Sequence, residues 1–522
     1  MSADTAAPPA IETPWRRLDK RMLVVGPLNS LGRLLPVVAL LLITGQGDVT
    51  RLWIALAAAT LVVAAGVLRW RTTRYRITAD RVELHSGWLR RERRSVPRDR
   101  IRTVDLTVRL LHRAFGLSLV RVGTASGDSF ADAGSLSLDA VSKAEADRLR
   151  RALLDRSPAA AGTAAEAAAP GQEIARLDWA WLRFAPLTFS SLAGVGALGA
   201  AVFNLFNELG LGPRDIGAVD AAADRLAGTP IWLGIAVLGS AVLATAVVGA
   251  LVVFAERWFA YQLTREPDGT LRVRRGLLTR RSLSVSEQRL RGAEIVEPLL
   301  LRAGKGAQCR ALSTGLSRDA QGGALQPPVP RGEAHRVASA ALRAHPLEIT
   351  QAPLRAHPPA ARARRLSRSV VPAVVLVAIA FGMGATVPAA SWLGPASLIL
   401  VPLAALLGLD RYRNLGHELT GRYLVARQGS LQRRTVALQR SGVIGWTFRQ
   451  SLFQRRSGLV SVEAITAAGE GGYTVLDVAA PDGVALADAA IPHLLTPFLA
   501  APDDHDRDHG SHVPPHGAHP TA

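Results

Sequence analysis

The 522-residue sequence has one cysteine, three methionines and only 5% aromatic residues. The single cysteine, Cys309, has no partner for an intrachain disulfide and no second cysteine with which to bind zinc. Acidic residues are also scarce, since 42 Asp and Glu stand against 62 Lys and Arg, which gives a formal net charge of +20. These shortages exclude a disulfide-stapled secreted domain and indicate that the soluble parts lie in a reducing compartment.

The sequence also lacks the motifs of common enzymes. HELTG at His417 begins like the HExxH helix of zinc proteases, but Gly421 occupies the position of the second histidine. No GxSxG elbow is present, and Cys309 lacks the signature of an activated nucleophile. The histidine-rich tail is expected to be disordered. We therefore predict that the protein is not an enzyme, and we predict no catalytic residue, no metal ligand and no cofactor.

Long apolar runs are present, so hydrophobic and charged residues must be segregated along this basic chain. Crossing a bilayer core of about 30 Å takes roughly 20 apolar helical residues. Six runs lie in three pairs: Leu34–Thr44 (extended back towards Leu23) with Leu52–Leu68, Phe184–Phe206 with Ile231–Phe254, and Val370–Val387 with Trp392–Leu409. Each pair predicts a transmembrane helical hairpin. Arg33, near the middle of the longest version of the first run, is either an interfacial residue or a functional intramembrane charge.

The distribution of Lys and Arg around these runs predicts their orientation. Basic segments such as TPWRRLDKRM and RWRTTRYR flank the hairpins, whereas the turns within the first two hairpins are neutral or acidic. Basic flanks remain on the cytoplasmic side of a membrane. We therefore predict a multi-pass plasma-membrane protein with both termini and all long polar regions in the cytoplasm.

The regions that follow the three hairpins share one pattern, which predicts a threefold internal repeat. An RRLD-like element precedes each hairpin, at Arg16, Ala175 and Arg364. The regions then contain YRIT, YQLT or HELT, a Gly-x-Leu turn, a basic cluster, a polar-Arg pair, and a glycine eight residues before a threonine. The Gly-x-Leu turns begin at Gly87, Gly276 and Gly429; the polar-Arg pairs are Asp99–Arg100, Gln288–Arg289 and Gln439–Arg440; the later glycines are Gly116, Gly306 and Gly458.

Within the first repeat the local pattern is that of short β-strands. RYRIT, RVELHS and LVRVGT alternate polar and apolar residues. Gly87, which directly follows RVELHS and lies between two predicted strands, suits a tight turn with positive φ. An amphipathic helix is predicted at SKAEADRLRRALLDR, where Ser142 and Glu145 fit a capping box. AHRVASAALRAH and ALADAAIPHLLTPFLA are the corresponding helices in the other repeats.

Several strands closed by one helix, repeated after each hairpin, resemble the bacterial pleckstrin-homology (PH) domain of the bPH2 type. The whole arrangement resembles the YdbT-type membrane proteins, over residues 15–500. The residues that carry the resemblance are YRITADRVELHSGWLRRERRSVPRDRIRTVDLTVRLLHRAFGLSLVRVGTAS and the two later sets of echoes. The second repeat departs by an insertion at EPDG, and the third is two residues shorter between Gly429 and Arg440. The resemblance implies a membrane-anchored, non-catalytic protein that acts at the cell envelope.

The predicted fold is an α+β membrane protein, with three transmembrane hairpins (six helices) that alternate with three PH-like β-barrel or sandwich domains, each closed by a C-terminal helix. Its segments are an N-terminal tail (1–22), hairpin 1 (23–68), domain 1 (69–157), an Ala/Pro-rich linker (158–173), hairpin 2 (174–255), domain 2 (256–348), a basic linker (349–366), hairpin 3 (367–410), domain 3 (411–500) and the tail (501–522).

Clusters of arginine provide the candidate binding residues. They are Arg90, Arg91, Arg93, Arg94, Arg274, Arg275, Arg280, Arg281, Arg433 and Arg434. Such clusters either contact anionic lipid or a protein partner, or they are solvated strand faces. The expected partners are the lipid bilayer and either a smaller bPH2-domain membrane protein or another copy of the chain. Nucleic acid is disfavoured because no base-reading helix accompanies the arginines. The alternative function is a transporter or channel built on the six helices.

Overall fold

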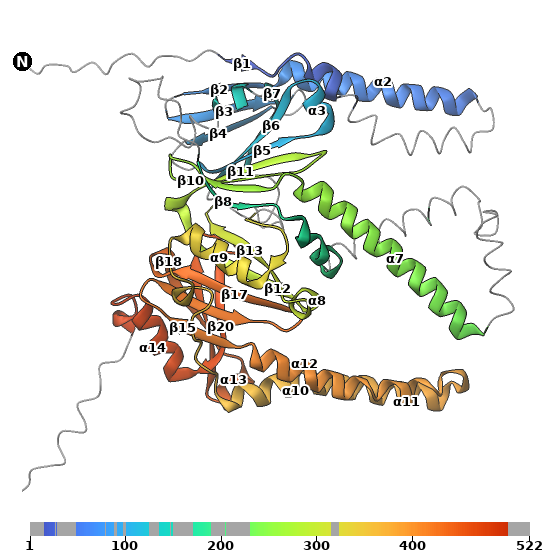
Figure 1. The fold of residues 1–522 in the computed structure, drawn as a ribbon, viewed down its shortest axis with the longest axis vertical. Helices are drawn as coiled ribbons and strands as arrows, with labels where there is room; N and C mark the ends of the chain where they lie inside the picture. Colours follow the sequence, from blue (N-terminus) through green and yellow to red (C-terminus); the bar gives the residue numbers. More distant parts are fainter. Residues whose placement is uncertain are drawn as a thin grey trace, which may run out of the picture.

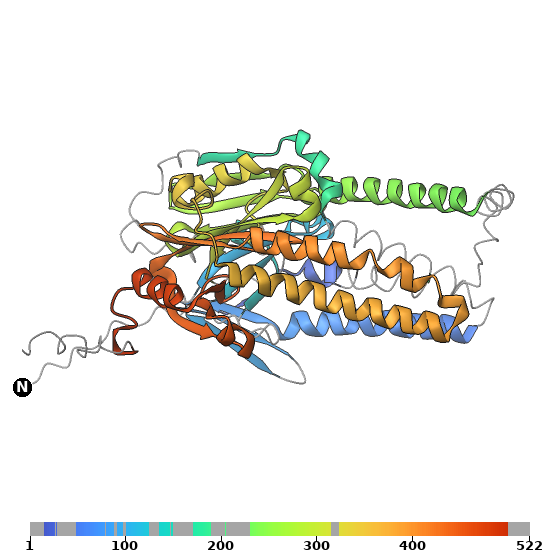
Figure 2. The ribbon, with the colours of Figure 1, turned by 90° about the horizontal axis from the view of Figure 1, so that it is seen from below.

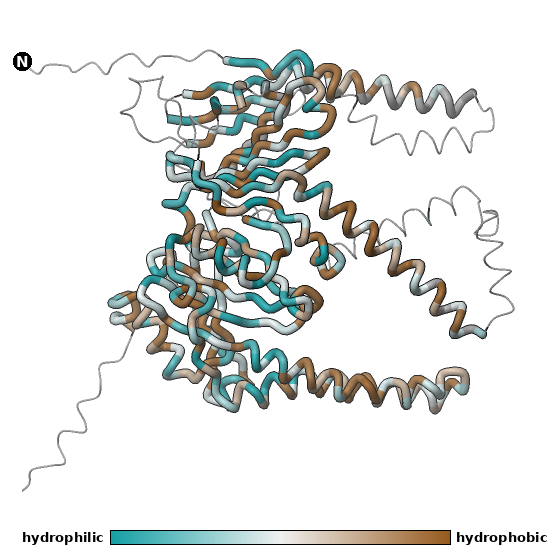
Figure 3. Tube along the Cα trace, viewed as in Figure 1, coloured by the Kyte–Doolittle hydropathy of each residue, from teal (hydrophilic) through white to brown (hydrophobic). Residues whose placement is uncertain are grey.

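The computed structural model consists of β-sheets stacked along one axis and long helices that all leave the stack on the same side (Figure 1). A perpendicular view shows the same arrangement (Figure 2), and the helices are the most continuously apolar part of the chain (Figure 3). The structure describes residues 15–26, 28, 49–78, 80–87, 91–97, 101–124, 135–142, 144–146, 148–149, 171–188, 204, 230–314 and 323–498. Charged and apolar segments are thus separated in space, as their separation in the sequence predicts.

The first of three similar structural units contains two groups of strands. One is the sheet β1-β2-β3-β4, and the other consists of β5, β6 and β7. The bounds are β1 Arg16–Arg17, β2 Arg74–Ile77, β3 Arg81–Ser86, β4 Glu92–Pro97, β5 Ile101–Val108, α3 Leu110–Ala114, β6 Leu117–Thr124 and β7 Ser135–Ser142. Residues 144–146 and 148–149 are helical. The Glu145 N–H donates to Ser142 Oγ at 3.3 Å, which is half of the predicted capping box.

The second unit repeats this order of elements. Its bounds are β8 Gln172–Arg176, η2 Trp179–Leu187, β9 Gln262–Arg265, β10 Thr270–Arg275, β11 Arg280–Ser286, η4 Glu287–Arg289, β12 Leu290–Pro298, α8 Leu299–Ala303, β13 Gly306–Ser313, β14 Val329–Pro330, α9 Arg331–Leu342 and η5 Pro346–Glu348. Helix α9 lies where the closing helix is predicted. It buries Ala334, Val337 and Ala338 in the core of this unit.

The third unit has the same order again. Its bounds are β15 Gly416–Leu419, β16 Tyr423–Gln428, β17 Gln432–Gln439, η7 Arg440–Gly442, β18 Val443–Arg449, α13 Leu452–Arg456, β19 Leu459–Thr466, β20 Gly472–Ala479, α14 Ala480–Ala490 and η8 Thr496–Phe498. The closing helix α14 ends two residues before Pro492, because the residue that precedes a proline is disfavoured in helical conformation.

Neighbouring units share their sheets. Strand β11 of the second unit pairs with β5 of the first, which produces a seven-stranded sheet of order β7-β6-β5-β11-β10-β9-β8. Strand β17 of the third unit pairs with β12 of the second in a six-stranded sheet of order β14-β13-β12-β17-β16-β15. We call the β5–β11 contact junction 1–2 and the β12–β17 contact junction 2–3. Sheet β18-β19-β20 completes the third unit.

The two junctions use the same register. At junction 1–2 the fifth residue after the turn glycine Gly276, Arg281, pairs with the twentieth residue after Gly87, Thr107. At junction 2–3 the fifth residue after Gly429, Arg434, pairs with the twentieth residue after Gly276, Val296. The chain therefore uses one contact twice, with equivalent backbone positions facing each other each time.

The turn glycines confirm part of the predicted repeat. Gly87, Gly276 and Gly429 have φ of 101°, 107° and 101°, as tight turns with positive φ require. Each lies 14 residues before the residue where β5, β12 or β18 begins its pairing with the next strand. The spacing is thus constant, and the predicted two-residue shortening of the third repeat is wrong. It came from matching Arg440 to Arg289, whereas Gly442 occupies the equivalent backbone position.

Two other sequence echoes also differ from the structure. The left-handed residue equivalent to Gly116 and Gly458 (φ 68° and 63°) is Lys305 (φ 57°), not the following glycine. The third RRLD-like element, at Arg364, lies inside a helix, and Arg355 instead forms the bridge to His417 that a strand provides in the other units. Matching the repeats by residue type and spacing therefore placed both equivalent positions wrongly, by one residue or more.

The long helices are α2 Val49–Thr72, α7 Ile231–Trp258, α10 Pro359–Thr386 and α12 Leu400–Arg413, with η6 Pro388–Ala390 and α11 Leu393–Ser397 between the last two. Among the described residues, Trp232–Trp258, Pro359–Thr386 and Pro388–Arg413 are long and apolar enough to cross a membrane. The last two lie side by side, since a Cβ on Gly408 would be 3.2 Å from the Arg365 carbonyl oxygen.

The six predicted helices are therefore only partly represented. Helix α2 covers the predicted run Leu52–Leu68. The run Leu34–Thr44, the residue Arg33 and most of Phe184–Phe206 lie outside the described residues, and the 3-10 helix η2 reaches into the start of the last run. The structure supports three candidate membrane helices and β-sheet domains that fit a PH-like fold.

Candidate functional site

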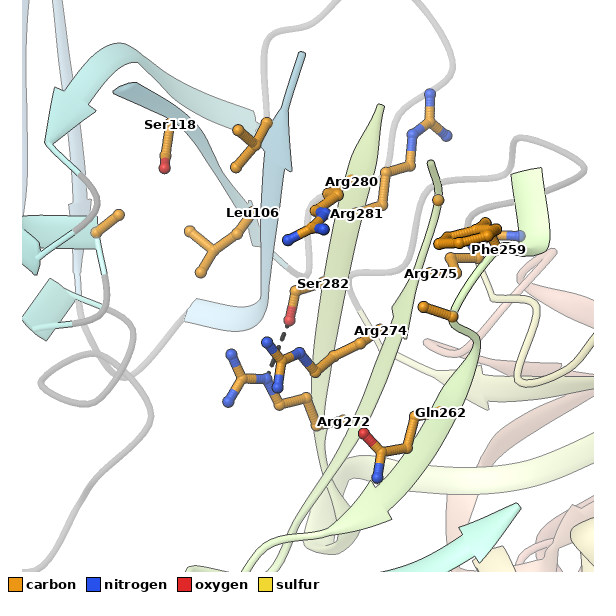
Figure 4. A pocket seen from close by; sticks show the side chains of 14 residues that line it. Leu106, Ser118, Phe259, Gln262, Arg272, Arg274, Arg275, Arg280, Arg281 and Ser282 are labelled. Atoms are coloured by element: carbon orange, nitrogen blue, oxygen red, sulfur yellow. Dashed lines mark hydrogen bonds between the residues drawn. The ribbon is translucent and has the colours of Figure 1, made fainter. Parts of the chain in front are cut away.

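An arginine-rich cavity of about 370 Å³ lies at junction 1–2 (Figure 4). Its walls come from β5, β6, β9, β10 and β11, from Ala146 of the first unit, and from Phe259 and Ala260, which directly follow helix α7. Five arginines line it: Arg272, Arg274, Arg275, Arg280 and Arg281. Leu106, Val108 and Phe259 contribute apolar surface. We call this site the junction cavity; it combines a dense positive charge with apolar walls.

A tight turn fixes the cavity against the end of a candidate membrane helix. The Gly276 N–H donates to the Phe259 carbonyl and the Leu277 N–H to the Glu256 carbonyl, both at 2.9 Å. The adjacent Leu277 and Leu278 side chains are exposed. Because Trp258 ends the candidate span, the apolar tip of this turn lies at the level where a membrane surface would meet the helix.

The two junctions differ in how their arginines are neutralised. At junction 2–3, Arg433 donates two hydrogen bonds of 2.7 Å to Glu297, and Arg434 contacts Glu470 at 2.7 Å. At junction 1–2 the residue equivalent to Arg433 is Arg280, which pairs with Val108. The carboxylate of junction 2–3 is therefore replaced by an aliphatic side chain in the junction cavity.

Among the residues that the structure describes, two carboxylates lie near the five arginines. Glu266 contacts Arg272 at 3.5 Å, and Asp105 lies close to Arg281 and Arg275. Burial raises the pKa of Asp105, while the nearby arginines oppose this change. Burial and the charge of Arg281 lower the pKa of Arg275 to about 10, so the guanidinium is still protonated at neutral pH. Counted over the described residues, the junction cavity thus has more arginines than carboxylates.

Arg275 also packs on an aromatic ring. Its guanidinium carbon lies 4.2 Å from the centre of the Trp258 ring, at the end of helix α7. On the other side of the cavity, Arg272 Nε donates to Ser282 Oγ at 3.1 Å (Figure 4). These contacts hold Arg275 and Arg272 in place before any ligand arrives, which lowers the entropy cost of binding an anion.

The structure brings together four of the ten candidate arginines. Arg274, Arg275, Arg280 and Arg281 line the junction cavity, and Arg433 and Arg434 lie in ion pairs at junction 2–3. Arg93 and Arg94 are on β4, Arg91 directly precedes it, and Arg90 lies outside the described residues. Arg272 was missed, although the alternation in TLRVRR places it on the same face of the strand as Arg274.

Other potentially reactive groups lie in structural positions. Cys309 is fully buried in β13, and burial raises the pKa of its thiol. His417 belongs to strand β15, and its Nδ1 lies 3.1 Å from Nε2 of His357. Within the described ranges no group of three or more His, Cys, Asp or Glu could hold a metal ion.

The architecture described above fits one class of protein, a membrane protein with bacterial PH-like domains. Comparison with protein families agrees with it, since the family described as Bacterial PH domain matches residues 30–157 and 369–490. Between these regions, the second unit has the same order of strands. No solved structure matches the chain.

A curated relative makes the assignment more specific. The chain is 24% identical over 443 residues to the UPF0699 transmembrane protein YdbT of Bacillus subtilis (strain 168), which covers 80% of this chain and 85% of the relative. Together with the two PH-domain matches, this similarity supports a YdbT-type bPH2 membrane protein.

Proposed function

We propose that this protein is a non-enzymatic plasma-membrane protein whose junction cavity binds the phosphate-bearing headgroups of anionic lipids. The observation that carries the proposal is the position of the cavity: five arginines gather beside the last turn of a candidate membrane helix. A headgroup at the bilayer surface reaches this level, and its acyl chains can lie along the helix.

We also propose a six-helix arrangement in which the termini and the PH-like units are cytoplasmic. The described helices α2, α7 and α10–α12 leave the sheets on one side, which is compatible with one membrane plane (Figure 1). In α7, α10 and α12 the charged residues occur at the end next to the sheets. A transporter usually places ionisable groups near the bilayer midplane, so these helices do not favour that alternative.

The expected strength follows from simple electrostatics. Each basic residue near an anionic membrane surface contributes about 1 kcal/mol. Removing two arginine charges should therefore weaken binding of an anionic lipid by about 2 kcal/mol, or roughly 30-fold. Arg280 and Arg281 are the best choice, because both side chains are exposed at the cavity.

The test uses the full chain purified in detergent, with lipid retention measured by native mass spectrometry. Wild type should retain phosphatidylglycerol in preference to phosphatidylcholine, and the Arg280→Gln/Arg281→Gln variant should lose this preference. A matched control removes two arginines from exposed ion pairs elsewhere, Arg343→Gln and Arg355→Gln. Competition by inorganic phosphate at equal strength would assign the site to free phosphate. Equal retention of both lipids by wild type would refute the proposal.

A further inference from the structure

In the part of the chain that the structure describes, several strands lie at sheet edges, and two of them, β4 and β18, are equivalent to strands that pair across junctions 1–2 and 2–3. Within the part of the chain that the structure describes, β4 pairs only with β3, and β18 pairs only with β19. Their side chains are correspondingly more exposed than those of their equivalents: Phe448 of β18 is exposed, whereas the equivalent Ile295 of β12 is fully buried. Free edges of this kind accept a further strand unless they are protected.

These two edges are of complementary types. Strand β4 occupies the same position in its unit as β11 and β17, and β18 the same position as β5 and β12. Both junctions inside the chain pair a strand of the first type with one of the second. One end of the stack thus presents the strand type that the other end would bind.

We propose that β18 of one chain pairs with β4 of a second copy of this chain, in the register of the two internal junctions. In that register the fifth residue after Gly87, Glu92, lies opposite the twentieth residue after Gly429, Arg449. Arg94 then lies opposite Thr447, and Arg93 opposite Phe448. The contact continues an interface that the chain already forms twice.

In this register Glu92 and Arg449, which contact Arg94 and Glu463 within the chain, face each other across the contact. Glu92 and Arg449 are 52% and 71% exposed, and directly opposed charges stabilise an antiparallel pair. At the internal junctions the position equivalent to Glu92 is occupied by Arg281 or Arg434. The position equivalent to Arg449 is occupied there by an uncharged residue, Thr107 or Val296. At this pair of positions, the Glu–Arg combination therefore occurs in the proposed contact and at neither internal junction.

Pro97 on β4 does not block this pairing. A proline cannot donate to a neighbouring strand and often protects a sheet edge. Its equivalents, Ser286 and Gln439, lie one residue beyond the paired stretch at both internal junctions. The missing N–H of Pro97 therefore costs no hydrogen bond in the proposed contact.

The contact is compatible with a membrane. All described long helices leave the stack on one side, so a copy added at either end keeps its helices on that side (Figure 2). Because the contact is head-to-tail, it repeats, and the chains form rows or closed rings rather than simple dimers.

Cysteine crosslinking of the full chain in liposomes tests the contact. The Glu92→Cys/Arg449→Cys variant should form a ladder of oxidised multimers, and a mixture of the two single variants should form a dimer and nothing larger. Wild type is the background control, because Cys309 is fully buried. A mixture of Glu92→Cys and Phe448→Cys chains tests the register, since residue 448 points to the opposite face. Monomers only, or equal crosslinking through position 448, would overturn the proposal.

Charge reversal provides a second test that needs no oxidation. Glu92→Arg or Arg449→Glu alone should lower the multimer fraction roughly tenfold, because like charges then face each other. The double reversal should return the fraction towards wild type. Unchanged multimers in both single variants, or no recovery in the double variant, would contradict the proposal. In the cysteine test, a different protein crosslinked at these positions in native membranes, in place of a second copy, would contradict it as well.

Discussion

Arg433→Gln should weaken junction 2–3 far more than the equivalent Arg280→Gln weakens junction 1–2. Glu297 is 2% exposed, and Arg433 provides it with two hydrogen bonds of 2.7 Å. Removing one member of a buried ion pair costs about 3–5 kcal/mol. Arg331 remains 3.3 Å from Glu297, so we expect the lower value, about 3 kcal/mol.

Arg280 is the matched control for this prediction. It has the same position in its unit, but it is exposed and lies opposite Val108, so its substitution should change stability by less than about 0.5 kcal/mol. Hydrogen exchange of the full chain in detergent separates the two effects. About 3 kcal/mol corresponds to roughly 150-fold faster exchange in β12 and β17. Similar changes in both variants would refute the reasoning, as would a Glu297→Gln/Arg433→Gln variant that is less stable than Arg433→Gln.

Three further predictions concern stability in thermal unfolding of the full chain. Gly276→Ala should lower the free energy of unfolding by more than 2 kcal/mol, about twice the effect of Gly269→Ala, because its Cβ would lie 2.0 Å from a backbone oxygen whereas Gly269 has open space. Asp477→Asn should cost about 3 kcal/mol by leaving Arg364 of α10 without its buried carboxylate, and an effect below 1 kcal/mol would contradict this. Burial and His357 lower the pKa of His417 to about 4, so between pH 6.5 and 4 the unfolded chain binds a proton at this residue that the folded chain does not. His417 alone should therefore lower stability by roughly 2 kcal/mol from pH 7 to pH 5, and the loss in His417→Gln should be smaller than that of wild type by this amount.

The repeat and its turns are predictable because they depend on local sequence. Alternation identifies the strands, and only glycine readily adopts the φ of 107° found at Gly276. Which residues occupy equivalent positions in the three repeats is harder to predict from the sequence. Lys305 adopts a left-handed conformation without being glycine, and Arg440 donates to the carbonyls of Ala489 and Ala490 rather than filling the position of Arg289. Residue types alone therefore misalign positions that backbone geometry fixes.

The junctions and the cavity are not predictable from one sequence. Pairing of β5 with β11 joins strands more than 170 residues apart, and no local period specifies which edges meet. The sequence identifies the basic cluster of the second repeat. Its arginines lie beside Trp258 because the turn at Gly276 is hydrogen-bonded to the end of helix α7, and this contact is not visible in the sequence. The predicted domain boundaries remain predictions, because two of the sheets contain strands of two neighbouring units.

The fourth residue after each turn glycine shows how context sets the role of a repeated residue. It is arginine in all three units: Arg91, Arg280 and Arg433. Arg433 faces Glu297 and is neutralised, Arg280 faces Val108 and contributes charge to the junction cavity, and Arg91 precedes a free edge. The arginine is the same each time, and the residue on the neighbouring strand decides whether it stabilises a junction or is available to a ligand. Differences between equivalent positions, rather than the repeat itself, therefore locate the sites where this protein can bind something else.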